Sequence, residues 1–166
     1  TNQTLVVKFP GHTEGLNTKL EAMKKTIARL PLVYQVTFSG AVPGEEVATF
    51  LSNRRTNDAL KQNRLYEMLA CDPDYVYAYG LQVVAGRNFS EDYGDDVDKL
   101  VINETAVRNL GFTSNDEAIG ELVNVECTDA PMQIIGVVKD YHQQALSKNY
   151  TPIMLIHKDK IAWLPQ

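Results

Sequence analysis

The chain has 166 residues, of which 44% are apolar and 22% charged, a composition typical of globular proteins. A chain of this length can bury a core without metal or disulfide staples, which excludes the disulfide-scaffold miniproteins. The net charge is −5 and the basic residues are scattered, so no nucleic-acid partner is expected, because phosphate binding needs a concentrated positive face. No apolar run approaches the ~18 residues that a membrane span requires.

The N-terminal part of the sequence predicts a β-α-β unit. Residues 5–9 form a β-rich run closed by Pro10-Gly11, and residues 33–38 alternate like a second strand. Between them a one-sided apolar stripe predicts a helix that ends before Pro31 and packs on a sheet, at Leu16, Leu20, Met23, Ile27 and Leu30. Residues 45–63 are the least regular part, and we expect a mobile hairpin or loop there.

The middle of the chain predicts a strand followed by a short helix. Residues 65–71 are the strand, and Asp72 and Pro73 are expected at the cap and first position of the helix, which Gly80 closes.

Helix caps and glycines organise the remainder of the chain. A strand at 100–102 leads into a helix over 104–110 that begins at Asn103 and ends at Gly111, and residues 114–120 repeat this pattern in miniature. The last predicted elements are a hairpin, residues 122–127 and 132–138, and a final strand, residues 152–157.

Motifs of the common enzyme classes are absent from the sequence. It contains no P-loop, G-x-G, G-x-S-x-G, H-E-x-x-H or C-x-x-C pattern, so we expect no catalytic residue, no cofactor and no metal. The acidic turn at 92–98 does not follow the calcium-loop register, and His12, His142 and His157 are scattered. Asp140 and His142 form the best acid-base pair, but a hydrogen-bonding role in the following turn is favoured over a hydrolase site.

Two further observations concern the context of the chain. Cys71 and Cys127 lack metal-ligand spacing, and the sequence leaves open whether they form a disulfide. The chain opens Thr1-Asn2-Gln3 with no initiator methionine and no signal peptide, so we expect a piece excised from a longer protein.

Five strings in a fixed order carry a family resemblance. They are GLQVVAGRNF at 80–89, LVINETA at 100–106, NLGF at 109–112, AIG at 118–120 and IGVVKDYH at 135–142. Together they resemble the extracytoplasmic core domain of MacB-type, FtsX-related ABC transporter permeases. The resemblance covers roughly residues 1–157.

The resemblance implies an α+β fold with a mixed sheet and packed helices. A β-α-β porter-like part would comprise residues 1–87 plus 131–166, with an inserted sabre-like part at residues 88–130. The family usually continues into further β-α-β structure, so the porter-like part is expected to be truncated at its C-terminus.

The resemblance also implies a non-enzymatic role at the periplasmic face of the inner membrane. ATP would be hydrolysed by a separate cognate ABC ATPase subunit or domain, and this domain would transmit the resulting motion. Further implied partners are a periplasmic adaptor or outer-membrane exit component and a second permease copy.

No catalytic residue is implied, and most residues of the matching strings read as structural. Glycines would serve turns, helix ends and close backbone approach; Asn103 would cap a helix, and Arg87 would anchor a carboxylate or carbonyl. The structural set is Gly86, Arg87, Asn103, Glu104, Gly111, Gly120, Gly136, Asp140 and His142. Contact with a partner is assigned to Asp92, Tyr93 and Tyr141.

Another class of function stays open at this point. The tyrosines at 75, 77 and 79 and the irregular residues 45–63 are also compatible with a stand-alone periplasmic module that binds a small ligand or peptide. Such a module requires a deep, partly apolar pocket.

Overall fold

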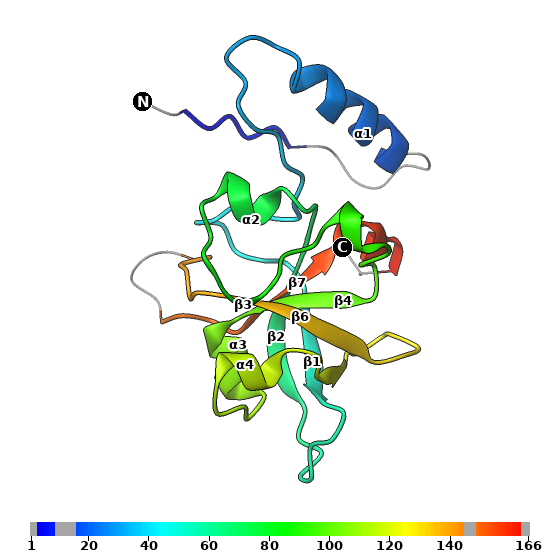
Figure 1. Ribbon diagram of the computed structural model, residues 1–166, viewed down its shortest axis with the longest axis vertical. Helices are drawn as coiled ribbons and strands as arrows, with labels where there is room; N and C mark the ends of the chain where they lie inside the picture. Colours follow the sequence, from blue (N-terminus) through cyan, green and yellow to red (C-terminus); the bar gives the residue numbers. More distant parts are fainter. Residues whose placement is uncertain (1–2, 9–15, 145–148, 164–166) are drawn as a thin grey trace. The chain divides into compact units, whose positions relative to one another are not determined.

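The computed structural model describes residues 3–8, 16–144 and 149–163, and the chain divides into two compact units, residues 1–34 and 35–166 (Figure 1). The first unit contains helix α1, Leu16–Ile27, which confirms the helix predicted before Pro31. Its packing on a sheet stays a prediction.

The two strands expected around α1 do not form. Residues 5–8 carry no strand, Phe9 lies outside the described residues, and residues 33–38 are likewise irregular. A β-rich run becomes a strand only when it forms a ladder with a neighbouring edge, and among the described residues neither run does so, although Phe38 O accepts from Asp72 N–H at 3.0 Å. Next to them, Ser39 alone forms an isolated antiparallel bridge, to Cys71.

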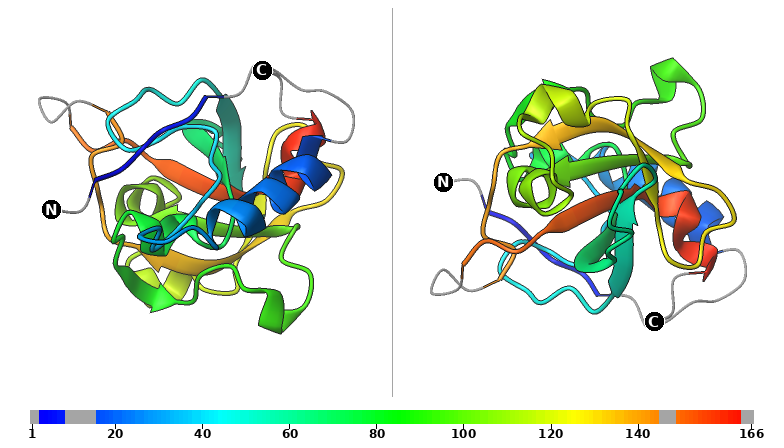
Figure 2. Two further views of the ribbon diagram at one scale, coloured as in Figure 1. Left: turned by 90° about the horizontal axis from the view of Figure 1, so that it is seen from above. Right: turned by 90° about the horizontal axis from the view of Figure 1, so that it is seen from below.

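The second unit is built on seven strands whose order is β3-β6-β4-β7-β2-β1-β5, and β5 also pairs with β6. Six strands therefore close into a ring, and β3 lies against β6 beside β5 (Figure 2). The sheet is mixed, because β2/β7 and β4/β6 are parallel while the other pairs are antiparallel, which confirms the α+β class. The strands are β1 Phe50–Arg55, β2 Arg64–Cys71, β3 Val83–Gly86, β4 Lys99–Asn103, β5 Leu122–Asn124, β6 Met132–Val138 and β7 Ile153–His157.

Short helices occupy the connections between these strands. They are α2 Tyr75–Ala78, the 3₁₀ turn η1 Glu91–Tyr93, α3 Glu104–Asn109, α4 Asn115–Ala118 and the 3₁₀ segment η2 Lys158–Trp163. The predicted N-caps of α3 and α4 are confirmed: Asn103 Oδ1 accepts from Ala106 N–H, and Ser114 Oγ accepts from Glu117 N–H.

Strand alternation divides the core into two clusters. Along β2, Tyr66 and Met68 belong to one cluster, which draws on every strand of the ring and on α3 and thus fills the inside of the ring. Leu69 and Cys71 belong to the other cluster, which packs the outer side of the strands beneath α2. Burying both faces explains why β4, β6 and β7 are apolar at nearly every position.

Two local predictions need comment. Of residues 45–63, expected as a mobile hairpin or loop, residues 50–55 form β1 of a hairpin with β2. β2 supplies their backbone partners, and the ring buries Asn53 between the thioethers of Met68 and Met154, each 3.3 Å from its Nδ2. Asp72 is not the cap of α2, which begins at Tyr75 after Asp74. The Asp72 carboxylate instead accepts from Thr37 Oγ1 at 2.6 Å and from two backbone N–H groups.

Candidate functional site

The acidic turn after β3 is held by an ion pair. Arg87 follows the last residue of β3, and its two terminal nitrogens donate to the Asp96 carboxylate at 2.8 and 2.9 Å. The same carboxylate accepts from Ser90 N–H at 3.0 Å, so it closes the turn from both ends. A bidentate pair of this kind fixes orientation as well as position.

This ion pair is more buried than a surface pair. The Asp96 side chain is 3% exposed and that of Arg87 is 31% exposed. Hydrogen bonding to Arg87 lowers the pKa of Asp96 below its ordinary value, against the opposing effect of burial. Asp96 therefore stays ionised at neutral pH.

The exposed tip of the same turn presents Tyr93, one of the residues assigned to partner contact. Its side chain is 70% exposed, and its ring lies 4.5 Å from the Arg87 guanidinium carbon, a cation-π contact. Asp92 is exposed beside it, with its N–H bonded to Ser90 Oγ. Both residues therefore lie on a turn that the Arg87–Asp96 pair orders.

A hollow of about 210 Å³ lies next to this turn, between η1 and the start of η2. Its lining is polar and carries charges of both signs, including Glu91, Asp95, Lys158 and Asp159. No group of three or more metal-ligating side chains occurs among the described residues. The hollow thus offers neither an apolar floor nor a metal centre.

Asp140 lies just after β6 and binds α3 through its carboxylate. That group accepts from Thr105 N–H at 2.8 Å, Thr105 Oγ1 at 2.9 Å and Arg108 Nη2 at 2.7 Å. Glu104 completes the connection by accepting from Asp140 N–H at 3.1 Å. All three donors belong to α3, so the Asp140 carboxylate joins the end of β6 to this helix.

The acid-base pairing of Asp140 with His142 finds no support in this geometry. The premise was that both residues share one face of a strand, but β6 ends at Val138. The ring of His142 lies 4.5 Å from that of Tyr150, while Asp140 faces α3. The role expected for Asp140 in the turn after His142 needs correction as well, because its carboxylate binds Thr105 and Arg108 of α3.

Tyr141, the third residue assigned to partner contact, packs against the outer core cluster. Burial raises the pKa of its hydroxyl above the ordinary value. Close by, Tyr75 donates to Gln143 Oε1 at 3.3 Å, and Gln143 Nε2 donates to Val42 O and Glu45 O at 2.8 and 3.1 Å. Tyr141 thus lies beside the hydrogen-bonded residues Tyr75 and Gln143 and is itself half-buried.

The glycines of the matching strings are required for two different reasons, close approach of two backbone segments and a positive φ angle. Gly86 and Gly136 are register partners in β3 and β6, and a Cβ on Gly136 would lie 1.9 Å from Arg87 O. Gly111 and Gly120 have φ of 82° and 86° and open space around the Cβ position, so their need is conformational alone.

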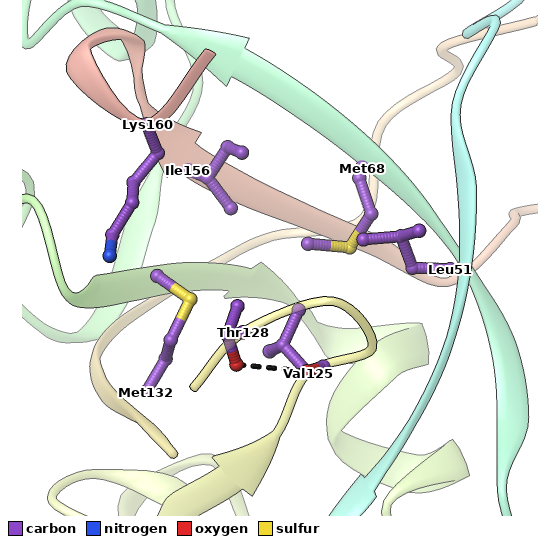
Figure 3. A pocket seen from close by; sticks show the side chains of 7 residues that line it. All are labelled: Leu51, Met68, Val125, Thr128, Met132, Ile156 and Lys160. Atoms are coloured by element: carbon purple, nitrogen blue, oxygen red, sulfur yellow. Dashed lines mark hydrogen bonds between the residues drawn. The ribbon is translucent and has the colours of Figure 1, made fainter. Parts of the chain in front are cut away.

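A very small cavity of about 10 Å³ lies inside the strand ring (Figure 3). Figure 3 shows its lining side chains converging from β1, β2, β7 and the loop after β5, with Thr128 Oγ1 donating to Val125 O at 2.8 Å. Lys160 lies at its edge and pairs with Asp98. Side chains therefore fill the ring, which leaves no room for a ligand.

The structure shows the state of both cysteines and the character of the helices. Cys71 is buried, Cys127 is exposed, and both are free thiols. Within the described part of the chain, no helix combines the length and apolar character needed to cross a bilayer.

Sequence reasoning missed an exposed apolar patch on the β1–β2 hairpin. Phe50, Leu60 and Leu65 are 50%, 74% and 64% exposed. The available signal was three large apolar residues in and beside a polar stretch: Phe50 and Leu60 within residues 45–63, where a mobile hairpin or loop is predicted, and Leu65 at the start of the predicted strand.

Comparison with known proteins gives a consistent result. A family model described as a MacB-like periplasmic core domain matches residues 2–165. A search of curated proteins gave no match.

Solved structures share the fold at low sequence identity. The extracellular domain of the noncanonic ABC-type transporter YknZ from Gram-positive bacteria is 18% identical, with a TM-score of 0.59, and the match covers 85% of this chain and 63% of that one. The periplasmic region of MacB from Actinobacillus actinomycetemcomitans is also 18% identical, with a TM-score of 0.53, covering 85% of this chain and 56% of the other. The chain thus spans less than two thirds of the length of either structure.

Proposed function

The chain belongs to the family of MacB-like periplasmic core domains, and on this premise we propose that it transmits ATP-driven motion within an ABC transporter permease and contacts extracytoplasmic partners during export. The observation that carries the proposal is the family match over residues 2–165, which coincides with the fold of two transporter domains.

The architecture of residues 35–166 suits a body that moves as one piece. Six strands close on each other, so their ladders leave few free edges at which the ring could open. Asp140 fastens α3 to the end of β6, and Arg87 with Asp96 orders the turn after β3. Close-packed interiors have low compressibility and pass displacement on without absorbing it.

The assembly around the domain is part of the proposal. ATP would be hydrolysed by a separate ABC ATPase domain or subunit, and the domain would lie at the periplasmic face of the inner membrane as one part of a permease dimer. A periplasmic adaptor or outer-membrane exit component would be the partner outside the membrane.

The division into subdomains is likewise proposed. Residues 1–87 plus 131–166 would form the porter-like part and residues 88–130 the inserted sabre-like part. A longer polypeptide would supply strands that pair with residues 5–9 and 33–38, which a structure of the complete permease tests directly.

The exposed thiol of Cys127 offers a test of motion transmission in the full-length permease with its ATPase. A nitroxide on Cys127 reports the distance between the two copies of a dimer by pulsed electron paramagnetic resonance. We expect the distance distribution to shift between the nucleotide-free and the ATP-vanadate-trapped states. A C127S variant controls for labelling elsewhere, since Cys71 is buried.

Two results would contradict the proposal. An identical distribution in both nucleotide states argues against transmission by this domain, and the absence of any dipolar signal argues against the dimer. A stand-alone binding module is not favoured by the two cavities described above, because one holds about 10 Å³ and the other is polar and smaller than a typical ligand pocket of 300–1,000 Å³.

A further inference from the structure

The strand ring has two distinct poles. Ser39, near the beginning of the second unit, bridges to Cys71 at the end of β2, and Cys71 is in register with His157, after which η2 begins. The chain therefore enters and leaves this unit at one pole. The β1–β2 turn, residues 56–63, lies at the other end of β2 (Figure 1). A strand of eight residues spans about 23 Å.

The outer face of the β1–β2 hairpin carries two exposed apolar side chains among polar ones, because Phe50 and Leu65 share it with Ser52, Arg54 and the buried Glu67. Ser52 is the register partner of Leu65, and Phe50 lies two residues along β1, so all three side chains are on one face. Phe50 and Leu65 are half or more exposed there. Most monomers scatter such residues singly, whereas here they adjoin on one projecting element.

The turn presents a third apolar side chain in a fixed position. The Asp58 carboxylate accepts from Leu60 N–H at 3.0 Å and from Gln62 N–H at 3.2 Å. Lys61, between them, has φ of 49°. These bonds order the tip while leaving Leu60 74% exposed, so little conformational entropy would be lost when Leu60 is covered.

Cations flank this apolar surface. Arg54 shares the outer face by strand alternation, and Lys61 is exposed in the turn. Neither forms an ion pair with any residue in the described ranges. The nearby carboxylates have other partners. Asp58 holds the turn, Glu126 accepts from Ser52 N–H at 2.7 Å, and Glu67, the register partner of Phe50, accepts from Gln144 Nε2 at 2.6 Å.

We propose that the β1–β2 hairpin docks a partner protein outside the membrane, through Leu60 and Leu65 near its tip, Phe50 farther along β1, and the cations Arg54 and Lys61, and that the partner presents apolar side chains bordered by carboxylates. Apolar anchors supply the binding energy of such an interface, and complementary charge at its rim sets orientation and association rate. This pole is the one farther from the points where the chain enters and leaves the unit. The inference rests on the proposed function, because only membership in a membrane permease turns that distance into a position away from the membrane.

Site-specific photo-crosslinking in the full-length permease, expressed in its own bacterium, tests the docking surface. Benzoylphenylalanine replaces Leu60, and the same residue replaces Tyr77 as a control, since Tyr77 is equally exposed at 65% but lies on α2. We expect Leu60 to capture one extracytoplasmic protein that Tyr77 does not. That protein, once purified, should bind the unsubstituted chain.

Charge reversal then checks the chemistry of the interface. L60E combined with L65E should weaken binding of the captured protein at least tenfold, and R54E with K61E should weaken it and reduce its salt dependence. Y77E should leave the affinity unchanged. Because Leu60, Lys61, Leu65 and Tyr77 are exposed and Arg54 is only half-buried, circular dichroism should show the same folded state in each variant.

The remaining outcomes overturn the inference. Capture of a second permease copy would make the hairpin a contact between copies, and capture of lipid would make it a membrane contact. Equal products from Leu60 and Tyr77, or none, would remove the site. The distance measurement at Cys127 is independent, so motion transmission and docking can fail separately.

Discussion

Replacing Gly136 by alanine should destabilise the domain through a backbone collision. The added Cβ would lie 1.9 Å from Arg87 O and 2.9 Å from Arg87 C, whereas ordinary van der Waals contact begins at 3.4 Å. Both obstacles are backbone atoms, so no side-chain rotation relieves them. The segment after β3 must move away from β6 by about 1.5 Å, which breaks the 2.9 Å bond from Arg87 N–H to Ile135 O.

The expected cost combines strain with a lost hydrogen bond and is about 2–4 kcal/mol of unfolding free energy. Urea denaturation of the 166-residue chain, followed by tryptophan fluorescence and circular dichroism, measures it. Gly40→Ala is the matched control, because the nearest atoms to its Cβ would be 3.8 and 3.9 Å away, and we expect a change within about 0.5 kcal/mol. If G136A is as stable as G40A, the close approach of the two segments is wrong.

Three further predictions concern the ion pairs and the thiols. D96N should lower the unfolding free energy by about 1–2 kcal/mol, a modest cost because the Arg87 partner of Asp96 is partly exposed. Since the pKa of Asp96 is lowered in the fold, this stabilisation is present above the ordinary pKa of 3.8 and is lost as the pH falls below it. The stabilities of wild type and D96N should therefore converge in acid denaturation. D140N should cost about 1–2 kcal/mol by weakening three hydrogen bonds to α3, measured by urea denaturation, and unchanged hydrogen exchange in α3 would contradict it. Ellman's reagent should modify Cys127 at once and Cys71 only after unfolding, because burial also raises the pKa of the Cys71 thiol; two fast thiols would contradict the fold.

The best sequence predictions were those that depend on local backbone chemistry. Asn103 and Ser114 were expected at helix starts, and both side chains accept the bond that a free N–H group of the first turn requires. Gly80 was expected at a helix end and has φ of 63°. Such signals involve residues a few positions apart, so the sequence carries them complete.

The wrong predictions share a dependence on distant partners. Residues 33–38 have the composition of a strand but form no ladder among the described residues. Residues 52–58 have a polar, turn-like composition, yet the first four of them lie in β1 because β2 and β5 supply partners. Asp72 looks like a helix cap, yet Thr37 and Phe38 bind its carboxylate. Pairing and capping of this kind are decided by segments far apart in the chain.

Sequence alone therefore determined the helices, most strands, the α+β class and, through the order of five short strings, the family. Tertiary structure decided that six strands close into a ring, that Arg87 finds Asp96, and that Asp140 turns to α3 and away from His142. It also decided which apolar residues stay outside, at Phe50, Leu60 and Leu65. The physical reason is that composition sets what each segment can form, while burial and pairing depend on which segments meet.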